Sequence, residues 1–425
     1  MSIKTFLASR VTQHLTDQQR LAARREKTDR RRAMRGDACM VDYFHDASDP
    51  YSHLVAQILP TLLERYDIEL VPHLVAPPPD WAAPDREKLI SYSRLDAERL
   101  ARKAGLSFTD PGQQPGDGRM KLAEAALARA MEAGSFAEEA VGIGNWLWSG
   151  EGTPPEAGGD AATVKRAGTD RREEAGHYLA GTFHLDGEWF WGLDRLHYLE
   201  DRLAKAGLRK TNAPEAAIFP PPPLLTNPPS KPGPAPELHY YLSFRSPYTY
   251  IAAERVKALA DAYGAGLKLR FVLPMVMRGM QVPRTKGLYI LKDTAREAHR
   301  LGIPFGKVAD PVGEPVERGY AILPWAIEQG RGYDFALSFM KGVWAEGIDA
   351  GSDSGLKTIV ERAGLDWKTA KPLIGNEDWK PQAEANRDEM MGLGLWGVPS
   401  FRVGDFSAWG QDRLWLIEDA LKGAS

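Results

Sequence analysis

The feature that most constrains the fold of this chain is an internal repeat. Segments 41–75 and 238–273 carry one pattern, in which a Pro-Tyr pair recurs 197 residues apart, at positions 50–51 and 247–248. Segments 183–203 and 401–421 agree again, sharing Trp-Gly, Asp-Arg-Leu and Glu-Asp at equal spacing. Self-similarity over this length predicts that one structural unit is used twice.

The order of patterns within each copy predicts an α/β unit. An aromatic-rich strand, a tight turn, an amphipathic helix and a second strand open each copy, and a strand, a hairpin partner and a helix close it. Segments with helical spacing lie between, at about 85–178 and 285–392. This arrangement predicts two thioredoxin-like domains, residues 38–204 and 238–425, each with a helical insertion.

Two further segments lie outside the copies. Residues 205–237 contain FPPPPLLTNPPSKPGPAPE, whose proline density predicts an extended linker. Residues 1–37 form a basic N-terminal arm, which we interpret as a solvated helix because acidic residues alternate with the basic ones.

Composition narrows the classes of function. The 425 residues are 43% hydrophobic and 26% charged with a net charge of -3, so nothing favours nucleic acid or an anionic membrane as partner. No apolar stretch is long enough to span a membrane and no secretory signal opens the chain, so we expect a cytoplasmic protein. A single cysteine, Cys39, leaves no C-x-x-C pair. Dithiol oxidoreductase activity is therefore not expected.

Six pieces of the second copy follow one another in a specific order. They are SPYTY (246–250), KGLYILKDTAREAHRLGIPF (286–305), VWAEGIDA (343–350), AGLDW (363–367), GLWGVPSFRV (394–403) and WGQDRL (409–414). With these pieces the second copy resembles the 2-hydroxychromene-2-carboxylate isomerases and kappa-class glutathione transferases, relatives of the DsbA-like oxidoreductases.

The resemblance implies glutathione as cofactor and assigns its contacts. In that family the serine before Pro-Tyr hydrogen-bonds the glutathione sulfur, which implies Ser246 as the catalytic residue. The residue before the cis-proline pairs with the peptide-like part of glutathione, which implies Val398 with Pro399. The pair at the start of the last helix holds the γ-glutamyl end, which implies Gln411 and Asp412.

At the start of a helix Ser246 could act as a helix cap or stabilise a ligand thiolate, and the sequence does not decide between these two roles. Serine followed by proline is a favourable helix start, with the hydroxyl as N-cap. A ligand thiol at the same helix end would be stabilised as thiolate. Asp49, at the equivalent place, caps equally well but would oppose thiolate formation.

The remaining candidates rest on weaker patterns. Lys286 is a candidate for the glycine carboxylate of glutathione, although it could equally be a solvated lysine. Tyr248, Trp396 and Trp409 are candidates for an apolar substrate pocket, although core packing is the commoner role. Asp412 and Asp194 can each cap the last helix of their copy. The histidines show no metal-ligand spacing, and we expect no metal.

The first copy departs from the family pattern at three contacts. Asp49 replaces the serine, Gly181 the proline and Leu193 the glutamine. We interpret it as a degenerate domain retained for packing or pairing. Because related enzymes pair two such domains, an intramolecular pseudo-dimer is expected.

The predicted function is a glutathione-dependent isomerase. The Ser246-stabilised thiolate would add to an unsaturated carbonyl carbon of an aromatic substrate, permit rotation and leave. Two alternatives remain open: a kappa-class-like transferase that conjugates electrophiles, and a non-catalytic tandem binding module.

Overall fold

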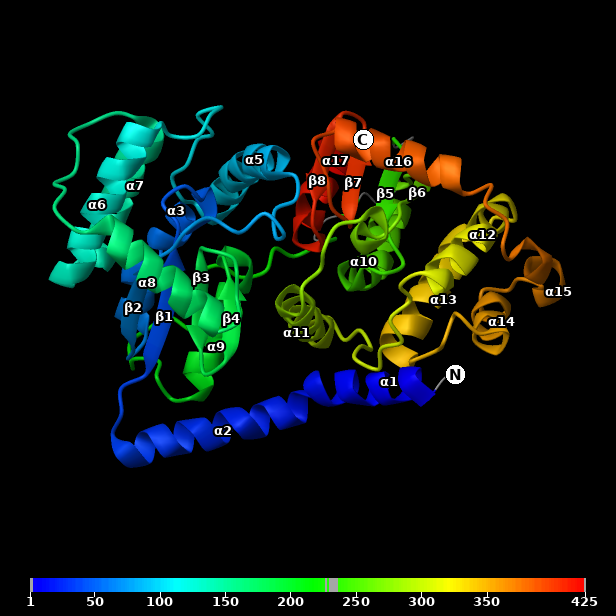
Figure 1. The fold of residues 1–425 in the computed structure, drawn as a ribbon, viewed down its shortest axis with the longest axis horizontal. Coiled ribbons are helices and arrows are strands. Elements are labelled where there is room, and N and C mark those ends of the chain that lie inside the picture. Colours follow the sequence, from blue (N-terminus) through cyan, green and yellow to red (C-terminus); the bar gives the residue numbers. More distant parts are fainter. Residues whose placement is uncertain (1–2, 226–227, 229–235, 424–425) are drawn as a thin grey trace. The chain divides into compact units, whose positions relative to one another are not determined.

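The computed structural model describes residues 3–225, 228 and 236–423, and the chain divides into two compact units (Figure 1). The first unit comprises Ala22–Pro221, and the second unit comprises Met1–Leu21 together with Pro222–Ser425. Each unit contains one four-stranded sheet with helices packed on it. The predicted α/β fold class is confirmed.

The sheet of the first unit has the strand order β2-β1-β3-β4. Strand β1 (Met40–His45) is parallel to β2 (Glu69–Leu74) and antiparallel to β3 (Thr182–Leu185), which pairs with β4 (Glu188–Trp191). The helices and 3-10 turn of this unit are α3 (Pro50–Ala56), α4 (Leu59–Arg65), α5 (Arg86–Ala104), α6 (Asp117–Ala133), α7 (Phe136–Ser149), α8 (Ala161–Glu174), η1 (Leu193–Arg195) and α9 (Leu196–Lys205), with most of α2 (Gln18–Arg35).

The sheet of the second unit has the same plan, in the order β6-β5-β7-β8. Strand β5 (Leu238–Leu242) is parallel to β6 (Leu267–Phe271) and antiparallel to β7 (Ser400–Val403), which pairs with β8 (Phe406–Trp409). The helical elements are α1 (Ile3–Leu15), α10 (Pro247–Tyr263), η2 (Met275–Arg278), α11 (Arg284–Arg300), α12 (Glu314–Glu328), α13 (Gly332–Lys341), the π-helical η3 (Gly342–Glu346), α14 (Asp353–Arg362), α15 (Trp367–Ala370), η4 (Lys371–Leu373), α16 (Lys380–Gly392), η5 (Gln411–Arg413) and α17 (Leu414–Gly423).

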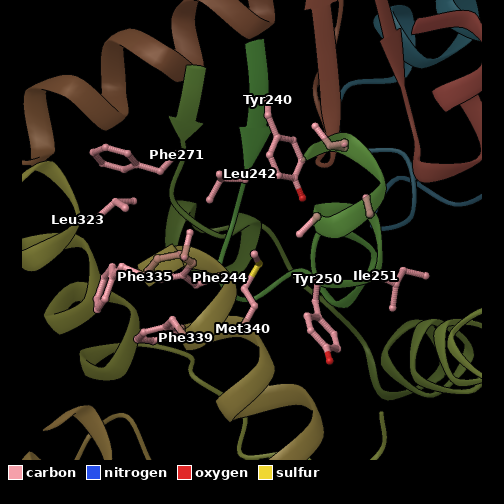
Figure 2. Packing of buried hydrophobic residues seen from close by; sticks show 14 of the residues in the cluster. Tyr240, Leu242, Phe244, Tyr250, Ile251, Phe271, Leu323, Phe335, Phe339 and Met340 are labelled. Carbon is pink, nitrogen blue, oxygen red and sulfur yellow. The ribbon is translucent and has the colours of Figure 1, made fainter. Parts of the chain in front are cut away.

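Strand β5 is buried along its whole length because helices pack on its sheet. Tyr240 and Leu242 contribute to the core on one face, as expected from the two-residue period of a strand. Figure 2 shows them beside Phe244, whose ring stacks on Phe339 of α13 with centroids 4.2 Å apart. The apolar residues of the helical insertion therefore build the second unit's core together with the sheet.

Part of the predicted 205–237 linker packs against the first unit. Lys210 N donates to Arg65 O at 2.9 Å, and Phe219 is buried in the core of this unit. Ile218 N donates to the buried carboxylate of Glu200 at 2.9 Å. These contacts fix the chain up to that point; of the remaining linker, residues 226–227 and 229–235 lie outside the described residues.

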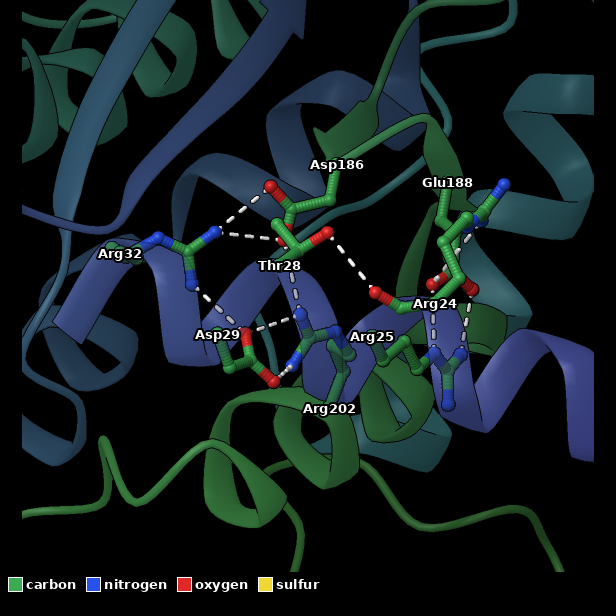
Figure 3. A network of polar contacts seen from close by, with 8 residues as sticks. All are labelled: Arg24, Arg25, Thr28, Asp29, Arg32, Asp186, Glu188 and Arg202. Atoms are coloured by element: carbon green, nitrogen blue, oxygen red, sulfur yellow. Dashed lines mark hydrogen bonds and ion pairs between the residues drawn. The ribbon is translucent and has the colours of Figure 1, made fainter. Parts of the chain in front are cut away.

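The N-terminal arm is held by ion pairs, in contrast to the solvated helix that its sequence suggests. Arg202 of α9 is buried and donates to both oxygens of Asp29 on α2 at 2.6 Å (Figure 3). Arg32 donates to Asp186 at 2.8 Å, and Arg25 donates to Glu188 at 2.6 Å. Helix α2 contributes no buried residue, so charge attaches it to the first unit.

Membrane spans and metal clusters are both absent from the described part of the chain. No helix in it combines the length and apolar character needed to cross a membrane. It also contains no group of three or more histidine, cysteine, aspartate or glutamate side chains placed to hold a metal ion.

Candidate functional site

Ser246 is the N-cap of α10, directly after the loop that leaves β5. Its Oγ accepts a hydrogen bond from Thr249 N at 3.2 Å, and Pro247 occupies the first helical turn. The oxygen thereby satisfies one of the backbone N–H groups that a helix leaves free at its start. The side chain is half-buried. Ser246 therefore caps α10, which is one of the two roles that the sequence left open.

The segment before β7 provides the second partner of Ser246. Its hydroxyl donates to the carbonyl oxygen of Val398 at 3.3 Å. The Val398–Pro399 peptide bond is cis, and Pro399 O accepts a hydrogen bond from Gly410 N at 2.9 Å. The structure therefore brings Ser246, Val398 and Pro399 together from distant parts of the sequence.

Two of the predicted pocket aromatics contact each other, Trp396 before β7 and Trp409 at the end of β8. The rings of Trp396 and Trp409 have centroids 4.9 Å apart at an angle of 59°. A Cβ atom at Gly397 would lie 2.6 Å from the Trp409 ring, so only glycine permits this approach. The third aromatic, Tyr248, donates its hydroxyl to Asp293 of α11 at 2.8 Å. That bond ties α10 to α11.

Gln411 belongs to a polar network that joins three elements. Its side-chain oxygen accepts from Arg255 of α10, and its Nε2 donates to Glu297 of α11 at 3.2 Å and to the adjacent Asp412. Arg300 donates to Glu297 at 2.8 Å. Gln411 and Glu297 are buried, and Asp412 is half-buried. The amide of Gln411 is engaged within the protein, and Asp412 is the more exposed acid.

The start of the last helix differs from the prediction. The 3-10 turns η1 and η5 begin after Gly192 and Gly410, which are their N-caps. Asp194 and Asp412 therefore lie inside these turns, and neither is at the cap position. The Trp-Gly-x-Asp-Arg pattern places a glycine, with its free backbone dihedrals, at the turn itself.

Lys286 lies in the first turns of α11 and is buried, which lowers the pKa of its ammonium group. Asp293 and Glu297, the residues through which α11 contacts Tyr248 and Gln411, lie further along the same helix. Eleven residues of helix from Lys286 to Glu297 span roughly 16 Å. Lys286 and the Gln411 network are therefore at separate places on α11.

Arg255 and Glu297 were missed by the sequence reading, although the repeat contains a signal for them. The 197-residue offset continues into the insertion, where Tyr51 donates to Asp96 at 2.7 Å as Tyr248 donates to Asp293. At the same offset Arg255 corresponds to Ile58 and Glu297 to Leu100. Ile58, Leu100 and Leu193 are all buried in the first unit's core. The network is thus replaced there by apolar residues.

The equivalent place in the first unit has an acid at the helix start. Asp49 caps α3 by accepting from Tyr51 N at 3.2 Å and Ser52 N at 3.0 Å. Loss of solvent, and next the neighbouring Asp46, raise the pKa of Asp49 to about 7. Gly181 takes the place of Pro399, since its carbonyl accepts from Gly192 N at 2.8 Å.

Comparison with known proteins concerns the second half of the chain. Residues 237–422 match the family described as DSBA-like thioredoxin domain. A 2-hydroxychromene-2-carboxylate isomerase of Pseudomonas putida is 23% identical over 190 residues, which cover 43% of this chain and 92% of that protein. The enzyme of the same name from Pseudomonas sp. strain C18 is 24% identical over 193 residues, covering 44% and 90%.

A solved structure of 2-hydroxychromene-2-carboxylate isomerase is 24% identical and covers 44% of this chain and 94% of its own, with a TM-score of 0.37. The predicted resemblance to these isomerases and to DsbA-like proteins is confirmed by the two sequence comparisons. The site around Ser246 thus lies within the residues, 237–422, that match the DSBA-like thioredoxin domain.

Proposed function

We propose that the second unit binds glutathione and acts as a glutathione-dependent isomerase, with Ser246 as its catalytic residue. The relatives' name, 2-hydroxychromene-2-carboxylate isomerase, supports the reaction class. The observation that carries the proposal is the position of the Ser246 Oγ at the start of α10, between Thr249 N and Val398 O.

The residues present suit a peptide-like thiol with an ammonium end. Ser246 would hold the sulfur, and the Val398 backbone beside Pro399 would pair with the peptide part. The carboxylate of Asp412 would bind the α-ammonium group of glutathione. Gln411 has its polar atoms engaged with Arg255, Glu297 and Asp412, so we assign it the role of positioning Asp412 rather than touching the ligand.

Glutathione would supply a thiol whose ionised form adds reversibly to an unsaturated carbonyl carbon of an aromatic substrate. The start of α10 favours that ionised form through its free N–H groups and dipole. Ser246 has one hydroxyl proton, which it donates to Val398 O. Turning that proton toward a sulfur anion leaves the Val398 carbonyl available to an N–H group of the ligand.

Trp396, Trp409 and Tyr248 are the candidates to receive the substrate's aromatic ring. Tyr248 and Trp409 are half-buried, whereas Trp396 is buried. Lys286 stays a candidate for the far carboxylate of glutathione. A cytoplasmic location suits the proposal, because the glutathione pool there is largely reduced.

Calorimetric titration of the full chain with millimolar glutathione tests the proposal. We expect one site per chain, with hydrogen-exchange protection at residues 246–250 and 396–412 and none at 49–53 and 178–194. Absence of binding would refute it. Turnover that returns all the glutathione supports isomerisation, whereas stoichiometric consumption of the thiol indicates conjugation instead. Binding without turnover of aromatic or electrophilic substrates indicates a binding module.

A further inference from the structure

Arg172 of α8, in the first unit, is a fully buried cation. Its side chain is 1% exposed. Its Nε and Nη1 atoms are buried and find no hydrogen-bond acceptor among the residues that the structure describes. Buried polar groups are nearly always hydrogen-bonded, and guanidinium stays charged at any physiological pH. The position of Arg172 therefore requires an explanation beyond packing.

The second unit shows that the fold does not need this charge. Helices α8 and α16 end in the same way, with His177 N bonded to Arg172 O at 3.0 Å and Leu395 N bonded to Met390 O at 3.2 Å. Both ends continue into a glycine with positive φ, Gly176 at 84° and Gly394 at 76°. Arg172 thus occupies the place of Met390, which is also fully buried.

Asp46 has the largest electrostatic interaction with Arg172 of any acid, but no hydrogen bond or ion pair joins the two among the described residues. Asp46 follows β1, is buried, and interacts with Arg172 electrostatically. Its Oδ1 accepts from Ser48 N at 2.9 Å and from Ser48 Oγ at 2.7 Å. Burial raises the pKa of Asp46, so its own charge is disfavoured. In the second unit, the equivalent residue is Ser243. Arg172 and Asp46 are therefore ionisable residues where the second unit has the uncharged Met390 and Ser243.

His177, which interacts electrostatically with Arg172, belongs to a cluster of aromatic side chains. His177 replaces the apolar Leu395 and stacks on Trp189, with ring centroids 4.4 Å apart. Its other neighbour is Tyr178, and Tyr178 contacts the half-buried Trp81 with centroids 5.0 Å apart. Ring contacts thus connect the half-buried Trp81 to His177 through Tyr178.

We propose that the first unit contains an anion site of its own, in which Arg172 binds a small carboxylate or an equally small inorganic anion. A guanidinium offers several donors in one plane, and a carboxylate accepts two of them at once. The anion would accept hydrogen bonds from Nε and Nη1, and its negative charge would compensate the buried positive charge of the guanidinium. The first unit is then a second binding domain, independent of any glutathione site in the second unit.

The test uses the full chain at constant ionic strength, with bromide, acetate and benzoate as probes. We expect saturable hydrogen-exchange protection of α8 and residues 43–48, and an anomalous bromide peak beside Arg172 in crystals. Arg172→Met copies the second unit and should abolish both. Arg166→Met removes an exposed charge from the same helix and should change neither.

The outcomes separate the possible occupants. Protection by acetate and benzoate but not by bromide identifies an organic acid, whereas protection by all three identifies a general anion site. Water alone between Arg172 and Asp46, or equal protection in Arg172→Met, overturns the proposal. If that variant fails to fold, the bromide peak and the saturation curve of the unchanged protein still decide.

Discussion

The hydroxyl oxygen of Ser246 accepts from Thr249 N while its proton goes to Val398 O. These two bonds let capping and thiolate stabilisation be measured separately. Capping depends on the oxygen accepting a bond, and sulfur binding depends on the hydroxyl donating one.

Ser246→Ala tests the sulfur contact. We expect about 1 kcal/mol of lost stability from the missing cap. We also expect the thiol pKa of bound glutathione to rise, because its anion has lost the hydroxyl donor, although the helix start remains. Thiolate absorbance against pH measures the second effect. Asp49→Ala, the equivalent change in the first unit, should destabilise without altering the thiol; unchanged turnover in Ser246→Ala would remove Ser246 from the mechanism.

The carboxyl group of Asp49 should make stability fall as pH rises. Its folded pKa, about 7, lies above the ordinary aspartate pKa of 3.8, so between these values the folded state binds more protons than the unfolded state. The free energy of unfolding then decreases with pH through that window. Asp49→Ser keeps a cap oxygen and should remove this slope. His45 and His53 have lowered pKa values and act oppositely, so the measurement is the difference between the two proteins' denaturation curves from pH 4 to 8.

At the scale of elements, the network of Arg255, Gln411 and Glu297 fastens α10, η5 and α11 together. The first unit makes the equivalent junction with Ile58, Leu193 and Leu100. The same junction is therefore built either from polar or from apolar residues, and mixtures should be unfavourable.

Single and triple replacements test this coupling. Arg255→Ile alone removes the donor to the Gln411 oxygen and the buried cation that interacts electrostatically with Asp412 and Glu297. It should cost about 3 kcal/mol, as removing one partner of a buried charged group does. The triple change Arg255→Ile, Gln411→Leu and Glu297→Leu should recover much of that loss, since an apolar substitute is often neutral. Denaturant unfolding measures both. The triple variant should still bind glutathione more weakly, because Asp412 has lost its support; additive losses would contradict the coupling.

Helix α2 offers a second test at this scale. Asp29→Ala removes the main partner of buried Arg202, and up to about 3 kcal/mol should be lost, because Asp186 remains. Glu26→Ala breaks the exposed Glu26–Arg30 pair on the same helix and should cost no more than about 0.5 kcal/mol. Equal effects in denaturant unfolding would show that burial does not govern this attachment.

At the scale of the whole molecule, each unit ties the connecting chain to its own last helix. Glu200 accepts from Ile218 N at 2.9 Å, and Glu418 accepts from Leu225 N at 3.0 Å. Tyr66 and Tyr263, which the repeat aligns, donate to these two glutamates at 3.5 Å and 2.9 Å. The connection is thus anchored by equivalent contacts in both units.

Pairing of the two units as an intramolecular pseudo-dimer stays a prediction from the resemblance. Small-angle scattering of the full chain should show one compact particle, because two paired domains tumble together. An envelope with two separated, independently tumbling lobes would contradict the pairing.

The α/β class and the start of α10 could be predicted because their causes are local. Strand and helix periods, Ser-Pro caps and glycine turns act over a few residues, and the repeat shows each of them twice. The role of Asp412 as a cap was wrong because the turn before the last helix begins two residues earlier, at Gly410. That shift depends on the contact of Gly410 N with Pro399 O.

The sequence by itself determined that two similar α/β units exist and that Ser246 differs from Asp49 at one helix start. Only the tertiary structure decided that Gln411 is engaged by Arg255 and Glu297. It also decided that Arg172 is buried with no hydrogen-bond acceptor for Nε or Nη1 among the residues that the structure describes. The physical reason is distance along the chain. Helix caps and strand periods involve near neighbours, whereas partners and burial of a polar side chain depend on elements that meet only after folding.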